Sequence, residues 1–151
     1  MDSDETVVWV DDLDAEVCWR LLNRQPIGRV AFTDGLGPLV LPVNHHVHGR
    51  SIVFRTGATT LLEALGGGAP VSFEVDEADA YGETGWSVLV RGRAVEIIDP
   101  VDRSEAEALP VHPWAPGARD HWIRIAPETV SGRAISHRRA DGHLLPYMPP
   151  D

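Results

Sequence analysis

Three histidines stand close together in the stretch LPVNHHVHGRSIVFRTG, residues 41–57. His46 and His48 have the spacing that places two imidazoles on one face of a strand, where they could bind a metal ion. The following positions 52–54 are apolar and supply no carboxylate ligand, so we interpret His46 and His48 as an exposed pair at a strand end. His45 falls on the opposite, apolar face, where the pattern fits both a core histidine and a ligand contact.

Arg55 and Thr56 offer a second kind of chemistry a few residues later. A guanidinium can bind a phosphate through two parallel N–H bonds, and the hydroxyls of Thr56, Thr59 and Thr60 lie at the entrance of a predicted short helix. The same pattern also fits a surface arginine followed by a threonine N-cap. It indicates a candidate phosphate site that needs support from the rest of the chain.

The composition restricts the classes of function. All 13 basic residues are arginine, which excludes chemistry that depends on a Schiff-base lysine or a P-loop lysine. A net charge of -10 opposes binding to nucleic acid or to anionic membranes. No apolar run reaches the roughly 20 residues of a membrane-spanning helix, and the acidic start MDSDET is unlike a signal peptide, so we expect a cytoplasmic protein. Cys18, the single cysteine, is expected to be a small buried side chain.

Short strands and a few helices have to position these residues. An amphipathic helix is predicted within residues 13–25, with Asp11 or Asp12 as its cap, and a meander of three antiparallel strands follows within residues 28–56. The remaining predicted elements are a helix at 59–65, a strand at 70–77, the longest strand at 85–99, a helix at 100–109 and one or two strands at 121–136. This order indicates a single antiparallel barrel or sandwich domain of the α+β class. The tail, residues 140–151, is expected to be loosely held.

Several segments, in this order, are similar to one family. They are IGRVAF, PLVLPVN, SIVFRTG, TLLEAL, VSFEVDE, GWSVLVRGRAVEI and IAPETVSGR. Together they resemble the pyridoxamine 5'-phosphate oxidase-like FMN-binding split-barrel proteins, particularly the short bacterial members, over about residues 13–135. The resemblance implies a mainly β, six-stranded antiparallel split barrel with short peripheral helices, with residues 1–151 as a single flavin-binding domain. It also implies a homodimer that binds two FMN molecules at the subunit interface.

Carried over by position, the resemblance assigns the cofactor site. The matching positions are Val43, Asn44, His45, Arg55, Thr56, Thr60, Trp86 and Ser87. The segment 43–45 would run beside the isoalloxazine ring, mostly through backbone contacts, while Arg55, Thr56 and Thr60 would contact the phosphate. The pair at 86–87 would reach the ring or the phosphate edge, often from the partner subunit.

Two further positions belong to this comparison. Arg133 matches a recurrent late arginine to which no role is assigned. Many relatives carry a lysine on the phosphate loop where this chain has Leu61, so the sequence predicts one cation fewer at the phosphate and weaker binding of FMN.

The resemblance implies an FMN-dependent oxidoreductase, or one that uses the deazaflavin coenzyme F420, acting on a small molecule. The cofactor would supply the hydride or electron transfer, while the protein supplies orientation and electrostatics. The alternative is a non-catalytic dimer that binds or sequesters flavin or haem, with His45 or His46 as a candidate iron ligand. Oxidation of pyridoxamine phosphate itself is not expected, because the longer C-terminal substrate segment of that enzyme has no match here.

Overall fold

The computed structural model describes residues 5–57, 59–65 and 67–139, and the side chains of Thr59 and Thr60 lie outside this description. The predicted loose tail, residues 140–151, also lies outside it. The elements in chain order are β1 (Thr6–Leu13), α1 (Ala15–Leu22), β2 (Ile27–Asp34), β3 (Gly37–His48), β4 (Ser51–Thr56), α2 (Thr59–Leu65), β5 (Gly67–Asp79), β6 (Thr84–Glu96), α3 (Pro100–Glu107) and β7 (His121–Arg139). None of the described helices is both long enough and apolar enough to span a membrane.

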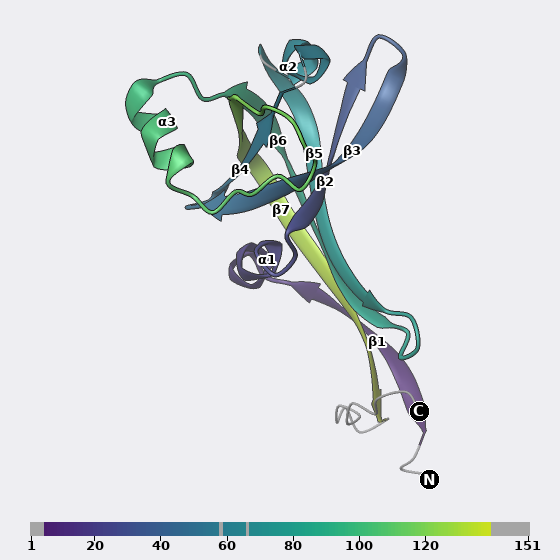
Figure 1. Cartoon of the computed structure of the whole chain (residues 1–151). Coiled ribbons are helices and arrows are strands. Elements are labelled where there is room, and N and C mark those ends of the chain that lie inside the picture. The colour runs from purple at the N-terminus through teal and green to yellow at the C-terminus, as the bar shows by residue number, and fades with distance from the viewer. Residues whose placement is uncertain (1–4, 58, 66, 140–151) are drawn as a thin grey trace.

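The strands form an antiparallel barrel. Their order is β1-β7-β4-β3-β2-β5-β6, and β6 pairs in turn with β7, so the six strands from β2 to β7 close on themselves. The predicted six-stranded antiparallel barrel with short helices is confirmed, with β1 as a seventh strand on the free edge of β7. Figure 1 shows this closed part at the top, with the three helices around it.

Buried and exposed side chains alternate along the strands, and the buried ones form the interior of the barrel. In β6, Val88, Val90 and Ala94 are buried while their neighbours face outwards, which is the two-residue period of a strand with one covered face. Phe54 and Phe73 are fully buried inside the barrel, in a core that also includes residues of α1 and α2. A smaller apolar cluster lies between the barrel and α3; its members are Val53, Ile97, Ala106, Val111 and Trp122.

The helix starts follow ordinary capping chemistry, with one correction. Asp14 caps α1, and its carboxylate accepts a hydrogen bond from the N–H of Val17 at 2.9 Å. The prediction of Asp11 or Asp12 as the cap was wrong, because both residues belong to β1. Asp99, which the sequence assigned to the end of the preceding strand, caps α3, and Pro100 opens the predicted helix.

A long arm extends away from the barrel. It consists of β1, the end of β7 and the far part of the β5–β6 hairpin, which run together towards the lower right of Figure 1. Val8 and Val10 of β1 are 60% and 57% exposed, and Tyr81 at the hairpin tip is exposed as well. The arm therefore presents apolar side chains that remain exposed among the residues the structure describes.

Candidate functional site

A pocket of about 180 Å³ gathers several of the residues that the sequence singled out. Its wall comes from the middle of β3, the end of β4, α2 and the loop 108–120 between α3 and β7, hereafter the α3–β7 loop. The lining residues are Leu41, Pro42, Val43, Asn44, Arg55, Thr56, Leu61, Pro113, Ala115 and Arg119. The structure thus brings the predicted ring-side strand and the predicted phosphate residues Arg55 and Thr56 to one place.

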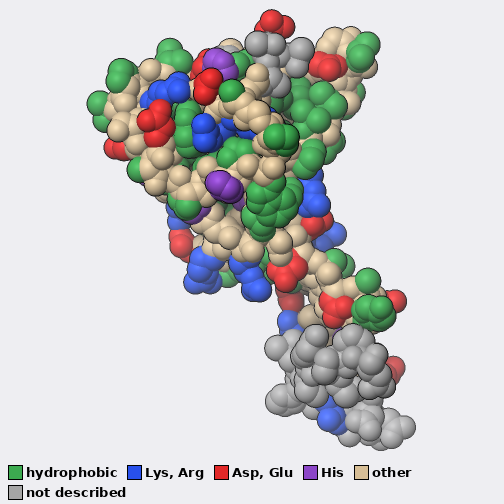
Figure 2. Space-filling model, viewed as in Figure 1, with side chains coloured by type: hydrophobic (Ala, Val, Ile, Leu, Met, Phe, Trp, Pro, Cys, Tyr) green, Lys and Arg blue, Asp and Glu red, His purple; other side chains and the backbone are tan. Residues whose placement is uncertain are grey.

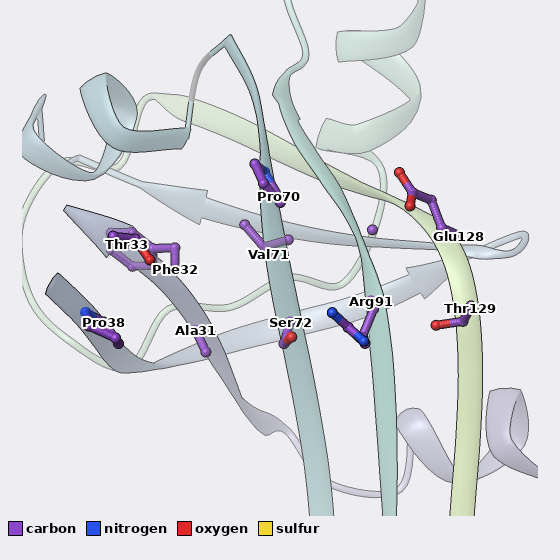
Figure 3. Close-up of a pocket in the computed structure, with 11 residues that line it drawn as sticks. Ala31, Phe32, Thr33, Pro38, Pro70, Val71, Ser72, Arg91, Glu128 and Thr129 are labelled. Carbon is purple, nitrogen blue, oxygen red and sulfur yellow. The ribbon is translucent and has the colours of Figure 1, made fainter.

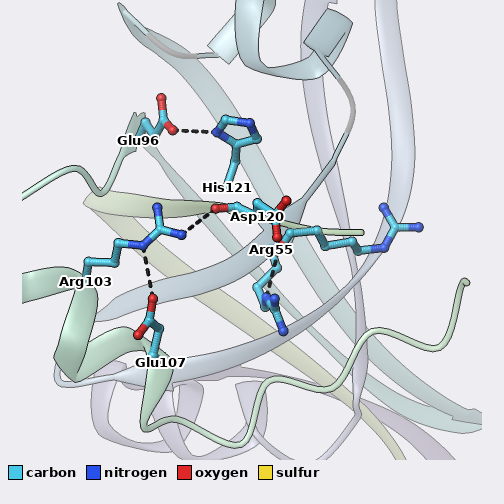
Figure 4. Close-up of polar contacts among 7 residues, drawn as sticks. Arg55, Glu96, Arg103, Glu107, Asp120 and His121 are labelled. Carbon is cyan, nitrogen blue, oxygen red and sulfur yellow. Dashed lines mark hydrogen bonds and ion pairs between the residues drawn. The ribbon is translucent and has the colours of Figure 1, made fainter. Parts of the chain in front are cut away.

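Arg55 is held in a fixed orientation. Its guanidinium carbon lies 4.9 Å from the ring centre of Trp122, its neighbour in the β4–β7 register, and its Nε donates to the carbonyl of Arg119 at 3.0 Å. Figure 4 shows this bond. In the described part of the chain no protein acceptor takes the two terminal nitrogens of Arg55. These nitrogens remain able to donate to an anion, and the stacking and the Nε bond have already fixed the plane of the fork.

Arg119 is the member of this pocket that sequence reasoning missed. It lies in the irregular stretch HPWAPGARD, where no periodic pattern marks it, and it reaches the pocket only because the α3–β7 loop folds back onto β4. A Cβ at Gly57 would overlap the carbonyl oxygen of Ala118, so glycine at the end of β4 permits this close approach. Two arginines, from elements distant in sequence, therefore share one pocket.

The charge around the pocket is uniformly positive. No carboxylate is among its lining residues, whereas three other pockets of the described chain include Glu128, Asp76 or Glu63. Within the described residues neither Arg55 nor Arg119 belongs to an ion pair with an acid. This arrangement, in a chain of net charge -10, favours an anionic group as the occupant.

Asn44 and Thr56 complete the polar part of the pocket. The Asn44 side chain donates to the carbonyl of Pro26 at 3.3 Å and accepts from the N–H of Trp114 at 2.9 Å. The amide oxygen thus holds the α3–β7 loop against β3, while the amide NH2 group holds the segment just before β2. Thr56 is buried and takes part in interactions within the chain.

Residues 14–134 of the chain match the family model described as pyridoxamine 5'-phosphate oxidase. The chain belongs to this family. An uncharacterized protein of Mycobacterium tuberculosis is 37% identical over 131 residues, which are 83% of this chain and 86% of the relative. The solved FAD binding protein from Mycobacterium smegmatis is 37% identical with a TM-score of 0.73, covering 82% of this chain and 97% of that one. A FAD-binding protein from Mesorhizobium loti is 27% identical with a TM-score of 0.71, covering 86% and 99%.

In this member of the pyridoxamine 5'-phosphate oxidase family, His45 lies in the core between α1 and the barrel. Its side chain is buried, its Nε2 lies 2.6 Å from the carbonyl oxygen of Leu22, and its ring meets Phe73 edge-on at 4.9 Å. Since a carbonyl can only accept, Nε2 carries the proton and Nδ1 is left as an acceptor, without a partner in the described chain. His45 is not among the residues that line the pocket of Arg55.

Trp86 and Ser87 lie elsewhere, on the arm. With Arg133 they line a second pocket of about 420 Å³, whose rim carries the carboxylates of Asp76, Glu77, Asp79 and Glu83. Ser87 and Arg133 are direct partners in the β6–β7 register. Within one chain of this family member, six of the predicted site residues are therefore divided between two pockets that share no residue, and His45 lines neither of them. The side chain of Thr60 lies outside the described part of the structure.

The remaining histidines of the β3 cluster, His46 and His48, are half-buried, so the interpretation of them as an exposed pair was wrong. Nε2 of His48 lies 3.7 Å from a carboxylate oxygen of Glu105 in α3, while partial burial, and then the neighbouring His48, lowers the pKa of His46. Across residues 5–57, 59–65 and 67–139, no cluster of three or more His, Cys, Asp or Glu side chains could hold a metal ion.

A third pocket, of about 450 Å³, was not anticipated from the sequence. Figure 3 shows it on the sheet formed by β2, β5, β6 and β7, with Arg91, Glu128 and Thr129 on one side and Phe32 and Pro38 on the other. It includes none of the residues that the resemblance assigned to the cofactor.

Proposed function

We propose that this protein binds a flavin nucleotide, FMN or FAD, with the flavin phosphate in the pocket of Arg55, and acts as an oxidoreductase on a small molecule. The observation that supports this most directly is the convergence of Val43, Asn44, Arg55 and Thr56 on one pocket without a carboxylate. The names of two solved relatives, both FAD-binding proteins, agree with a flavin nucleotide as the ligand.

The donor set fits the proposed ligand. Arg55 offers two terminal nitrogens to a phosphate, in the bidentate geometry that this side chain favours. Half-buried Val43 lies on β3, next to the part of the pocket formed by Arg55, and the apolar flavin ring can pack against it. The Asn44 side chain keeps the α3–β7 loop in place. When bound, the flavin supplies hydride or electron transfer, and the protein contributes its binding and orientation.

One chain supplies only part of such a site. A pocket of about 180 Å³ can take a phosphate group, but pockets that enclose a complete small ligand measure roughly 300–1,000 Å³. We therefore propose that a second copy provides the rest of the wall, and that its arm brings Trp86 and Ser87 to the flavin. This arrangement would unite the two groups of site residues that lie apart in a single chain.

The first test is the absorption spectrum of the purified protein, followed by titration with FMN, FAD and riboflavin. We expect flavin bands, or tight binding of added flavin nucleotide. A Soret band would identify haem, and a deazaflavin spectrum would identify coenzyme F420; either would overturn the proposed ligand. Failure to bind any flavin, with the protein folded, would overturn the proposed function as a whole.

The second test concerns Arg55. Loss of a charge-assisted contact in Arg55→Ala should weaken FMN and FAD by about ten- to a hundredfold and leave riboflavin, which has no phosphate, nearly unaffected. Arg20→Ala is the control. Arg20 is an exposed arginine of α1, so this substitution removes the same charge at a place away from the pocket. Equal weakening of FMN and riboflavin would show that Arg55 supports the fold and does not recognise the phosphate.

A further inference from the structure

We propose that Arg119 is the second phosphate-binding cation of this site, and that it makes the pocket selective for phosphorylated flavins over riboflavin. The inference rests on the proposed flavin function and adds a residue that the family pattern did not assign. Arg119 lines the same pocket as Arg55, but it comes from the α3–β7 loop, while Arg55 belongs to β4.

The backbone that carries Arg119 is anchored at three consecutive residues. The carbonyl of Arg119 accepts from Arg55, the carbonyl of Asp120 accepts from Nη2 of Arg103 at 2.7 Å, and Nδ1 of His121 lies 2.7 Å from a carboxylate oxygen of Glu96. Figure 4 shows these contacts side by side. The loop therefore holds Arg119 at the pocket before any ligand arrives, which reduces the entropy cost of binding.

Among the described residues, Arg119 forms no ion pair with a carboxylate. Six other arginines form ion pairs with carboxylates in the described residues; they are Arg24, Arg29, Arg50, Arg93, Arg103 and Arg138. Arg55 and Arg119 form none in that part of the chain, although the hydrogen bond from the Arg55 side chain to the Arg119 carbonyl keeps the two residues together. Two like charges held at one pocket repel each other, and a bound anion would relieve that repulsion.

Leu61, which lines the same pocket, explains why a second cation has to come from an element other than α2. Leu61 is only 5% exposed and packs in the barrel core, so α2 offers an apolar wall to the pocket. A phosphate monoester carries about 1.5 to 2 negative charges at neutral pH. Arg55 alone would leave part of this negative charge unbalanced. Arg119 adds a second positive charge, which comes from the α3–β7 loop.

The inference is tested with wild type, Arg119→Ala, Arg119→Lys and the control Arg20→Ala. Each is titrated with FMN, FAD and riboflavin at low and high salt, and its melting temperature is measured. The Arg55 bond uses the main-chain carbonyl of residue 119, so the alanine variant keeps it and should melt like wild type. We expect Arg119→Ala to bind FMN about ten- to a hundredfold more weakly, with a smaller salt dependence, and Arg119→Lys to recover part of the loss.

The three ligands separate the outcomes. A loss for FMN and FAD together indicates that Arg119 contacts the phosphate next to the ribityl chain, and a loss for FMN alone indicates the terminal dianion; both support the proposal. A loss for FAD alone, an equal loss for riboflavin, or no loss in a variant that melts like wild type would overturn it. These results are distinct from failure of the proposed function, in which wild type itself binds no flavin.

Discussion

His45 is a buried titratable side chain whose surroundings disfavour its protonated form. Burial lowers the pKa of His45, the nearby His46 lowers it further, and the hydrogen bond to the Leu22 carbonyl opposes the shift. In the unfolded chain a histidine has a pKa of about 6.5. Below that pH, His45 becomes protonated in the unfolded chain but stays neutral in the folded protein, and this favours unfolding. The contribution of His45 to stability is therefore complete above about pH 6.5 and is lost as the pH falls towards the pKa of the folded state.

We therefore expect acidification from pH 7.5 to 5.5 to destabilise wild type more than His45→Gln. The glutamine amide can still donate to the Leu22 carbonyl but does not titrate. Urea unfolding of both proteins at several pH values measures the difference. A stability gap between them that stays constant across this range would show that His45 does not titrate differently on folding.

The sequence predicted part of the pocket, and the reason is local. Val43, Asn44, Arg55 and Thr56 were assigned to one site through the family resemblance, and they come together because they lie in two neighbouring strands of the predicted meander. Arg119 could not be found in this way, because its place depends on a loop that returns to β4 over a separation of 64 residues. The prediction of one cation fewer at the phosphate considered position 61 alone. It did not include Arg119, which the α3–β7 loop brings to the pocket.

Gly57, at the end of β4, lies against the loop that carries Arg119, and a Cβ at this position would overlap the main chain of that loop. Gly57→Ala should push the Ala118 carbonyl away, lower the stability by about 1–3 kcal/mol and weaken flavin binding together with it. Gly35→Ala, in the turn between β2 and β3, is the matched control because a Cβ there meets nothing within 4 Å. Urea unfolding and FMN titration measure the two effects. Unchanged stability in Gly57→Ala would mean that the loop can move without cost.

Most elements followed from the sequence, and β1 did not. The helices at α2 and α3 and the meander β2–β3–β4 were confirmed, because their turns and caps carry clear local signals. The segment TVVWVDDL was missed since both of its faces are largely exposed, which removes the apolar and polar alternation that marks a strand. Its identity as a strand comes from pairing with β7.

The last strand shows how a breaking residue can be tolerated. Residues 121–136 were predicted as one or two strands, and they form part of the single strand β7. Pro127 sits in its interior, opposite Gly92, where the β6–β7 register shifts. A proline, which has no N–H to donate, fits at such an irregularity, and the strand continues through it.

For the molecule as a whole, the arm is the feature that argues for a second copy. The last residues of β7 pair only with β1, and a two-stranded ribbon is marginally stable by itself in water. Its apolar side chains, with Val8 and Val10 among them, are exposed, and Figure 2 shows hydrophobic and acidic side chains together near the end of the arm. A homodimer would cover this surface while completing the flavin site.

Mixing two defective variants tests this arrangement. If each site takes Arg55 from one copy and Trp86 from the other, a hybrid dimer of Arg55→Ala with Trp86→Ala contains one intact site. After exchange of subunits, about one quarter of all sites should regain the wild-type affinity for FMN. The control mixes Arg55→Ala with the double variant Arg55→Ala/Trp86→Ala, which cannot form an intact site. If dimers are present but the first mixture recovers no wild-type affinity for FMN, then Arg55 and Trp86 act at a site of the same copy, or one of them lies outside the site.

The many partners of β7 also determine when the barrel can form during synthesis. β7 pairs with β1, β4 and β6, so three strand edges stay open until the ribosome has released the segment up to Arg139. Pairing between such distant parts of a chain is slow, and open edges can pair with other chains in the meantime. Closure of this barrel therefore has to wait for β7, and the nascent chain is most prone to aggregate just before β7 emerges.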